Sequence, residues 1–292
     1  MREEEITPRD RTDNCPLPQA LRTGFTVLAG AAVGILIYEL LRKKHLVPET
    51  GKSTTLADSI TVTENGAVTR IMTFGWDNDE MCSWSREISL DESGNIEAVK
   101  LIEVEYSEGR IQISESAGED DPTPVFSTVL QDEYGMAKAV TRRNRSGRET
   151  RWDEKILGAE LMELTSDGAT GSFEWEDGNI VSISFGGNIA QRMTYYKSIE
   201  NHLFPDLNFL PLGLSSDMLL SHVLGTRTRN FLSTLEVVTE EEIKHYSFSY
   251  LFDAEDRPLQ IHQELYVLDV SGNDRGEGRR SVTDYDIKYL KK

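Results

Sequence analysis

Apolar and polar side chains alternate in short runs through residues 58–292. In the clearest run, the aromatic residues Tyr246, Phe248, Tyr250 and Phe252 are separated by single residues that include two serines. Successive side chains of a β-strand point to opposite faces, so this pattern predicts strands with one buried face and one wet face. Strands of this kind are typical of an antiparallel sheet rather than a parallel one.

Polar residues followed by a glycine separate these runs. Asn65-Gly66 and Asp177-Gly178 are two examples, and glycine adopts the positive φ that tight hairpins require. The sequence therefore predicts a meander of hairpins, with turns at residues 64–66, 91–95, 107–110, 132–135, 145–148 and 176–179.

The alternation stops at residues 199–235. Residues 204–211 form an apolar, proline-containing stretch, and residues 215–224 have the spacing of a short helix that begins at Ser215 or Ser216. We expect a mainly β fold: a curved antiparallel meander or incomplete barrel with this one short helix on its concave face. The residues expected to line a ligand groove there are Phe204, Leu207, Phe209, Met218 and Leu219.

A continuous apolar run occupies residues 23–41, with Glu39 as its one charged residue. As a helix it would be roughly 28 Å long, close to the thickness of a bilayer core. Arg42, Lys43 and Lys44 follow directly and could reach the headgroups. The run predicts an N-terminal transmembrane helix, whose anchoring residues would be Phe25, Val27, Leu28, Val33, Ile35, Leu36, Ile37 and Tyr38.

A cleaved signal peptide is the main alternative to this anchor. The preceding tail is long and contains the acidic residues 3–5, and the small residues 29–32 lie inside the apolar run rather than after it. These features favour an uncleaved anchor. Gly30 and Gly34 have the spacing of a helix-dimer face, which suggests a homodimer through the helix, although glycine is common in such helices. The predicted organisation is a polar tail (1–22), a transmembrane helix (23–41), a linker (42–57) and a β domain (58–292).

The charge of the chain limits its partners. The formal net charge is −19, and residues 46–292 contain 44 acidic against 24 basic residues. A nucleic-acid surface needs clustered cations, so nucleic acid is excluded as a partner. Lysine and arginine are evenly divided between the two flanks of the apolar run, but the denser cluster follows it. By the positive-inside rule that cluster favours the cytoplasm for the β domain.

No motif commits the chain to a chemistry. The cysteines Cys15 and Cys82 form no metal or redox spacing, and the five histidines lack the spacing of a zinc-binding helix. Nucleotide-binding loops and the serine-hydrolase elbow are also absent from the sequence. We therefore assign no catalytic residue, cofactor or metal.

The hairpins and the interrupted segment resemble a known family. The similarity is carried by residues 176–183, 201–225 and 246–261, and would extend over about residues 58–292. The family consists of uncharacterised exported bacterial β proteins with hairpin repeats like tyrosine–aspartate repeats. The resemblance implies a β domain outside the cytoplasm, with a curved sheet similar to the incomplete barrels of lipoprotein carriers. Cys15 precedes the apolar run, so the chain departs from the lipoprotein signal that such proteins often carry.

Two classes of function remain open. The first is a membrane-anchored cell-envelope domain, non-catalytic, that binds a glycan, an apolar ligand or an envelope protein, or has a structural role. The second is an envelope hydrolase, similar to a glycosidase, with carboxylates on its strands. The absence of a catalytic motif favours the first class. The resemblance, against the charge rule, places the domain in the bacterial envelope beside the lipid bilayer.

Overall fold

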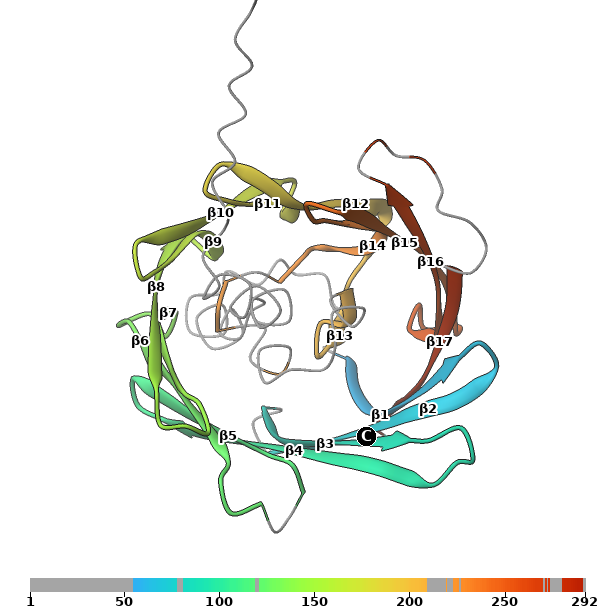
Figure 1. The fold of residues 1–292 in the computed structure, drawn as a ribbon, viewed down its shortest axis with the longest axis horizontal. Helices are drawn as coiled ribbons and strands as arrows, with labels where there is room; N and C mark the ends of the chain where they lie inside the picture. Colours follow the sequence, from blue (N-terminus) through green and yellow to red (C-terminus); the bar gives the residue numbers. More distant parts are fainter. Residues whose placement is uncertain are drawn as a thin grey trace, which may run out of the picture.

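The computed structural model describes residues 55–77, 81–118, 121–208, 219, 223–225, 227–269, 271, 273 and 280–290. These residues form a closed antiparallel barrel of 16 strands, and one further short strand lies inside the ring (Figure 1). The barrel strands are β1 (Thr55–Glu64), β2 (Ala67–Trp76), β3 (Cys82–Leu90), β4 (Ile96–Ser107), β5 (Arg110–Ser116), β6 (Val125–Gln131), β7 (Ala137–Arg143), β8 (Glu149–Leu157), β9 (Glu160–Ser166), β10 (Ala169–Glu176), β11 (Asn179–Phe185), β12 (Asn188–Glu200), β14 (Asn230–Val238), β15 (Glu242–Phe252), β16 (Pro258–Asp269) and β17 (Arg280–Tyr289).

The first and last strands close the ring. β1 pairs antiparallel with β17 from Ala57 opposite Tyr289 to Glu64 opposite Thr283. Every other barrel strand pairs with the strands before and after it along the chain. Closure gives a hydrogen-bond partner to the edge amides and carbonyls that an open sheet would expose. The expected incomplete barrel is therefore wrong: the sheet is curved and antiparallel, but it has no free edge.

The hairpin turns lie where polar residues precede glycine. Asn65 and Gly66 have φ of 50° and 87°, and Asp177 and Gly178 have φ of 52° and 76°. A second turn type uses a side chain: Asp132 accepts hydrogen bonds from the amides of Tyr134 (2.9 Å) and Met136 (2.8 Å). The turns that begin at Asp91, Asn144, Asp253 and Asp269 repeat this arrangement. Local sequence thus fixes both ends of the barrel.

The described residues between β12 and β14 fold back inside the barrel. We refer to the described residues of 201–229 as the infolded segment. Within it, β13 (Leu203–Phe204) pairs in parallel with the first residues of β1, Thr55 and Leu56. Backbone bonds also join the segment to the wall, from Leu161 to Gly225 (2.7 Å) and from Arg229 to Gly178 (2.9 Å). All these contacts lie at one end of the barrel, which we call the base; the opposite end, with the 65–66 and 144–148 turns, is the distal end.

The helices expected from the sequence are not part of the described structure. The elements of the described structure are all strands, and Val223–Gly225 form a turn, so the helix expected on the concave face is wrong. The proposed transmembrane helix at 23–41 lies outside the described residues. Within them, no helix is long and apolar enough to cross a bilayer.

Two glycines allow aromatic rings to lie flat on the wall. On the inner face, Phe185 covers Gly171, and a Cβ added at Gly171 would lie 2.5 Å from the Phe185 ring. On the outer face, Trp84 covers Gly75 in the same way, with its indole nitrogen 1.9 Å from the position of an added Cβ. A ring over a strand glycine restores the packing that the missing side chain would supply.

We therefore expect Gly171→Ala to lower the free energy of unfolding by about 1–3 kcal/mol, because the new methyl group displaces Phe185. Urea denaturation would measure the loss. In the Phe185→Leu background the same substitution should cost less, and a double-mutant cycle tests this coupling. Equal costs in both backgrounds would contradict the explanation.

Candidate ligand site inside the barrel

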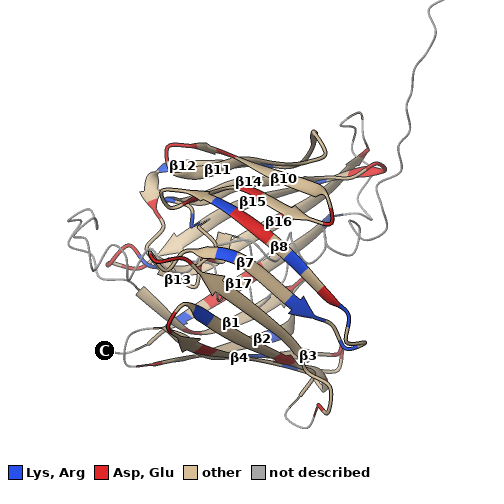
Figure 2. Cartoon of the chain, turned by 90° about the vertical axis from the view of Figure 1, so that its left-hand side faces the viewer, with Lys and Arg blue, Asp and Glu red and all other residues tan. Residues whose placement is uncertain are grey.

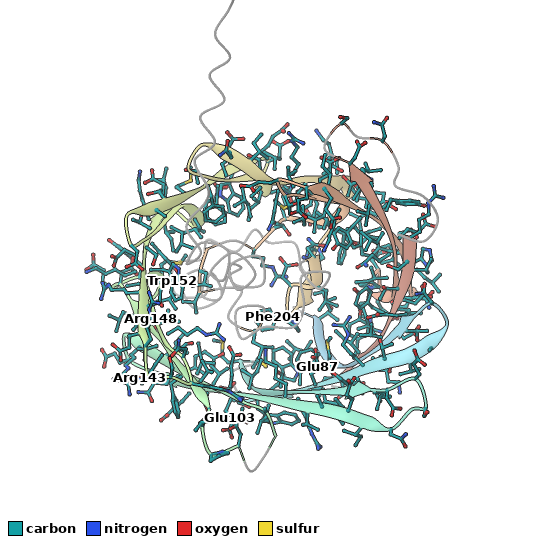
Figure 3. All side chains as sticks on the ribbon, viewed as in Figure 1. Glu87, Glu103, Arg143, Arg148, Trp152 and Phe204 are labelled. Atoms are coloured by element: carbon teal, nitrogen blue, oxygen red, sulfur yellow. The ribbon has the colours of Figure 1, made fainter. Side chains whose placement is uncertain are left out.

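The inner face of the barrel is largely apolar. Along each strand, alternate residues are buried in one continuous core, which includes Ile60, Met72, Ile102, Ile113 and Val129. At the base the infolded segment packs against this face. Phe204 lies inside the ring of strands (Figure 3), with its ring centroid 5.2 Å from that of Trp76. The base of the barrel is thus occupied by the chain itself.

A buried carboxylate fixes the infolded segment. Asp206 is fully buried and accepts hydrogen bonds from the Asn201 side-chain amide (2.8 Å) and the Asn208 backbone amide (3.0 Å). The backbone amide and the hydroxyl of Thr228 donate to its other oxygen, each at 3.3 Å. These donors replace the hydration that the carboxylate loses on burial.

Arg227 supplies the opposite charge. Its guanidinium donates to the carbonyl oxygens of Asn201 (3.0 Å) and Leu203 (3.1 Å), and lies 6.0 Å from the centroid of the Phe204 ring. Burial raises the pKa of Asp206, while the charge of Arg227 opposes that shift. Burial likewise lowers the pKa of Arg227. The two residues and their donors form a network that holds both ends of the infolded segment together.

Three asparagines connect this network to the wall. Asn208 donates to the Thr228 hydroxyl (2.6 Å) and to the carbonyl oxygen of Asn230 (2.8 Å), on β14. Asn230 and Asn179, on β11, exchange two hydrogen bonds of 2.9 and 3.0 Å. Asn208 also accepts from the Leu232 amide (3.0 Å). The network is therefore a structural anchor whose polar groups are hydrogen-bonded to one another and to β11 and β14.

The sequence-predicted groove residues are only partly described. Phe204, Leu207 and Leu219 are buried in the core of the barrel, whereas Phe209 and Met218 lie outside the described residues. Their role in lining a groove for a ligand stays a prediction. The predicted anchor residues Phe25–Tyr38, with Gly30 and Gly34, also lie outside the described residues.

Charged side chains replace apolar ones on the inner face towards the distal end. Lys100 shares a strand face with Ile102, and Arg142 shares one with Val140, each two residues away. The same spacing relates the other members to inward positions on their strands. We call this set the charged row: Glu64, Arg70, Glu87, Lys100, Glu115 and Arg142, on β1, β2, β3, β4, β5 and β7.

Ion pairs join most of the charged row. Arg70 contacts Glu64 at 3.0 Å. Glu115 contacts Lys100 at 3.3 Å and Arg142 at 3.5 Å. The side chains of Arg70, Arg142, Lys100 and Glu64 are 22%, 23%, 33% and 42% exposed, although they face inward. Water therefore reaches the inner wall at the distal end, in contrast to the filled base.

Glu87 lies between the two pairs, on the inner side of β3 (Figure 3). It is directly opposite Met72 on β2 and Lys100 on β4. Burial raises the pKa of its carboxyl, while the charges of Arg70 and Lys100 lower it. Among the described residues, its buried Oε2 has no hydrogen-bond donor. Glu87 thus has charge partners, but its buried Oε2 lacks a hydrogen bond within the described structure.

The row provides binding groups rather than a recognisable catalytic arrangement. The described residues contain no cluster of three or more metal-ligating side chains. His245 and His262 are not cross-strand neighbours; they contact Glu236 (3.3 Å) and Asp284 (2.7 Å). Cys82 is buried, which raises the pKa of its thiol to about 12. Such a thiol is a poor nucleophile at neutral pH.

Charged residues occur along β8 and neighbouring strands (Figure 2), and the exposed ion pairs among them lie on the outer face of the wall. Asp153 and Glu163 stand near the middle of β8 and β9, where Asp153 pairs with Arg151 (2.7 Å) and Glu163 pairs with Lys155. Arg192 on β12 contacts Glu236 on β14 at 3.3 Å. Large apolar residues such as Trp84 and Phe126 are exposed among these charges. Transmembrane barrels have an apolar outer band and a polar interior, whereas this outer wall mixes charged with apolar side chains around a largely apolar interior.

Comparison with known proteins shows the class of fold. No family model matches the sequence, and no curated protein matches it. A porin-like protein from Bacteroides uniformis ATCC 8492 superposes with a TM-score of 0.58 at 13% identity, covering 81% of this chain and 100% of that structure. A porin-like protein from Bacteroides vulgatus ATCC 8482 aligns at 13% identity over 81% of this chain and 99% of that one. Its TM-score of 0.27 is too low to indicate a shared fold. The chain therefore shares its β-barrel fold with the Bacteroides uniformis protein. The expected resemblance to an uncharacterised bacterial β family is consistent with this shared fold, whereas the hairpin repeats of that family are not confirmed.

The Asp206 network predicts a large stability effect. Asp206→Ala removes the negative charge that compensates Arg227 and leaves several buried donors without their acceptor, so the free energy of unfolding should fall by about 3–5 kcal/mol. The exposed pair offers a control, because Asp153→Ala on the outer wall should cost less than about 1 kcal/mol. Urea denaturation measures both. A similar small loss for the two variants would show that the network does not anchor the segment.

Proposed function

We propose that the barrel is a non-enzymatic binding module of the bacterial cell envelope, with the charged row as its ligand site. The observation that carries this proposal is the contrast inside the barrel. The base is filled by the infolded segment, whereas inward-facing charges at the distal end remain accessible to water. An interior dedicated to packing would use apolar residues at these positions, as it does two residues away at Val62, Met72, Ile102, Ile113 and Val140.

The envelope location rests on two indications. The sequence resembles exported bacterial β proteins, and a solved bacterial structure with this fold is described as porin-like. Such a fold suggests the lipid bilayer as a partner. The outer wall, however, places charged side chains at mid-strand, and arginine or lysine at the middle of a bilayer costs about 2–4 kcal/mol each. We therefore propose that the wall faces water.

The filled base also disfavours a transport pore. Phe204 and Leu207 are buried inside the ring, and the Asp206 network fastens the segment that carries them. The glycosidase-like alternative finds no support either, because Glu64 and Glu115 are committed to ion pairs with cations of the row. A binding role for the distal half of the interior is what remains.

A water-facing wall predicts that residues 55–292, or the full chain after removal of any membrane-bound part, stay monodisperse without detergent. Size-exclusion chromatography with light scattering would measure this behaviour. Aggregation that detergent reverses, or ion conductance after addition to a planar lipid bilayer, would contradict a water-facing, closed barrel.

Accessibility of the row predicts the rate of thiol labelling. In a Cys15→Ser background, Lys100→Cys should react with a charged maleimide at least tenfold faster than Ile102→Cys, which lies on the same inner face but is buried. Mass spectrometry of the intact protein would follow the reaction. Similar slow labelling at both positions would show that the row is closed to ligands.

A further inference from the structure

We propose that the charged row binds a neutral, polyhydroxylated ligand of the glycan type, and that Glu87 accepts a hydrogen bond from one of its hydroxyl groups. This inference rests on the proposed binding function and specifies its ligand class. Three features of the row support it: its balanced charge, the buried oxygen of Glu87, and the aromatic ring next to Arg142.

The row has no formal net charge. Three glutamates are balanced by two arginines and one lysine, and they alternate in sign around the inner wall from Glu64 on β1 to Arg142 on β7. A charged ligand would meet attraction and repulsion in equal measure and would still lose its hydration. A hydroxyl group both donates and accepts, so it can match either type of residue in the row. The row therefore favours neutral hydroxyl groups over ions.

Glu87 indicates that the row needs an additional hydrogen-bond donor. Arg70 and Lys100 already balance its charge, so a cationic ligand would be repelled by both. Its buried Oε2 nevertheless lacks a donor within the described structure. A buried acceptor without a hydrogen bond costs about 1–3 kcal/mol, which an added donor would recover. Glu87 as a whole is only partly buried, so a rotation of its carboxyl group can turn this oxygen towards the accessible interior, where a ligand hydroxyl supplies the donor without adding charge.

Trp152 adds an apolar surface beside the row. It lies on the inner face of β8, opposite Val140 on β7, and packs at the border of the core. Arg142 is two residues from Val140 on the same strand face and pairs with Thr150 of β8. An amphipathic ring next to hydrogen-bonding groups suits a ligand with one apolar face and polar edges, such as a sugar ring.

The test is ligand-observed NMR with defined trisaccharides. Maltotriose, cellotriose, mannotriose and N-acetylchitotriose are the neutral probes; trigalacturonate and a glucosamine trimer are their anionic and cationic counterparts. We expect saturation transfer to at least one neutral probe and none to the charged ones. Glu87→Gln should weaken that binding about tenfold or more, as expected for loss of a hydrogen bond to a charged acceptor.

The outer-face variant Glu103→Gln, on the neighbouring strand β4, is the matched control and should bind with unchanged affinity. A melting temperature of Glu87→Gln within a few degrees of the parent would show that its fold is retained. Binding of the charged trimers alone, equal affinity of the Glu87 variant, or no saturation transfer to any neutral probe would overturn this inference. If Lys100→Cys still labels rapidly, that failure would concern the ligand class and leave the binding function standing.

Discussion

The antiparallel pairing of β1 with β17 divides the molecule into an inside and an outside. It extends from Ala57 opposite Tyr289 to Glu64 opposite Thr283, and it gives the two terminal strands the partners that an open meander would lack. Once the sheet is closed, each strand's two faces have different surroundings. The apolar face must be covered from within, since no second sheet or layer of helices is described.

The infolded segment meets that requirement at the base. It brings Phe204 and Leu207 into the core, but its backbone also carries polar groups into an apolar space. Asp206, Arg227 and the asparagines satisfy those groups with one another and with β11 and β14. A polar network of this kind is stable only when complete, which explains why so many short-range and long-range bonds meet at Asp206.

The same closure creates the candidate site. Towards the distal end the inner wall changes from apolar residues to the charged row, whose side chains are partly exposed to water. The barrel fold, shared with a protein described as porin-like, is thus combined with an apolar, partly filled interior and an outer wall that mixes charged and apolar side chains. The fold alone does not determine whether the outer wall of a barrel faces water or lipid. The polarity of its inner and outer faces determines this.

The sequence by itself determined the strands, the turns and the break at residues 199–235, because alternation and glycine conformation are local properties. It could not determine closure, since Glu64 and Thr283 meet only in three dimensions. The charged row was missed because polar strand residues were assigned to the wet face. Lys100, Ile102 and Val104 are spaced two residues apart and therefore share one face of β4, so the alternation alone could have placed Lys100 on the inner face. Only the tertiary structure decided that six such residues, from six strands, lie on one inner wall.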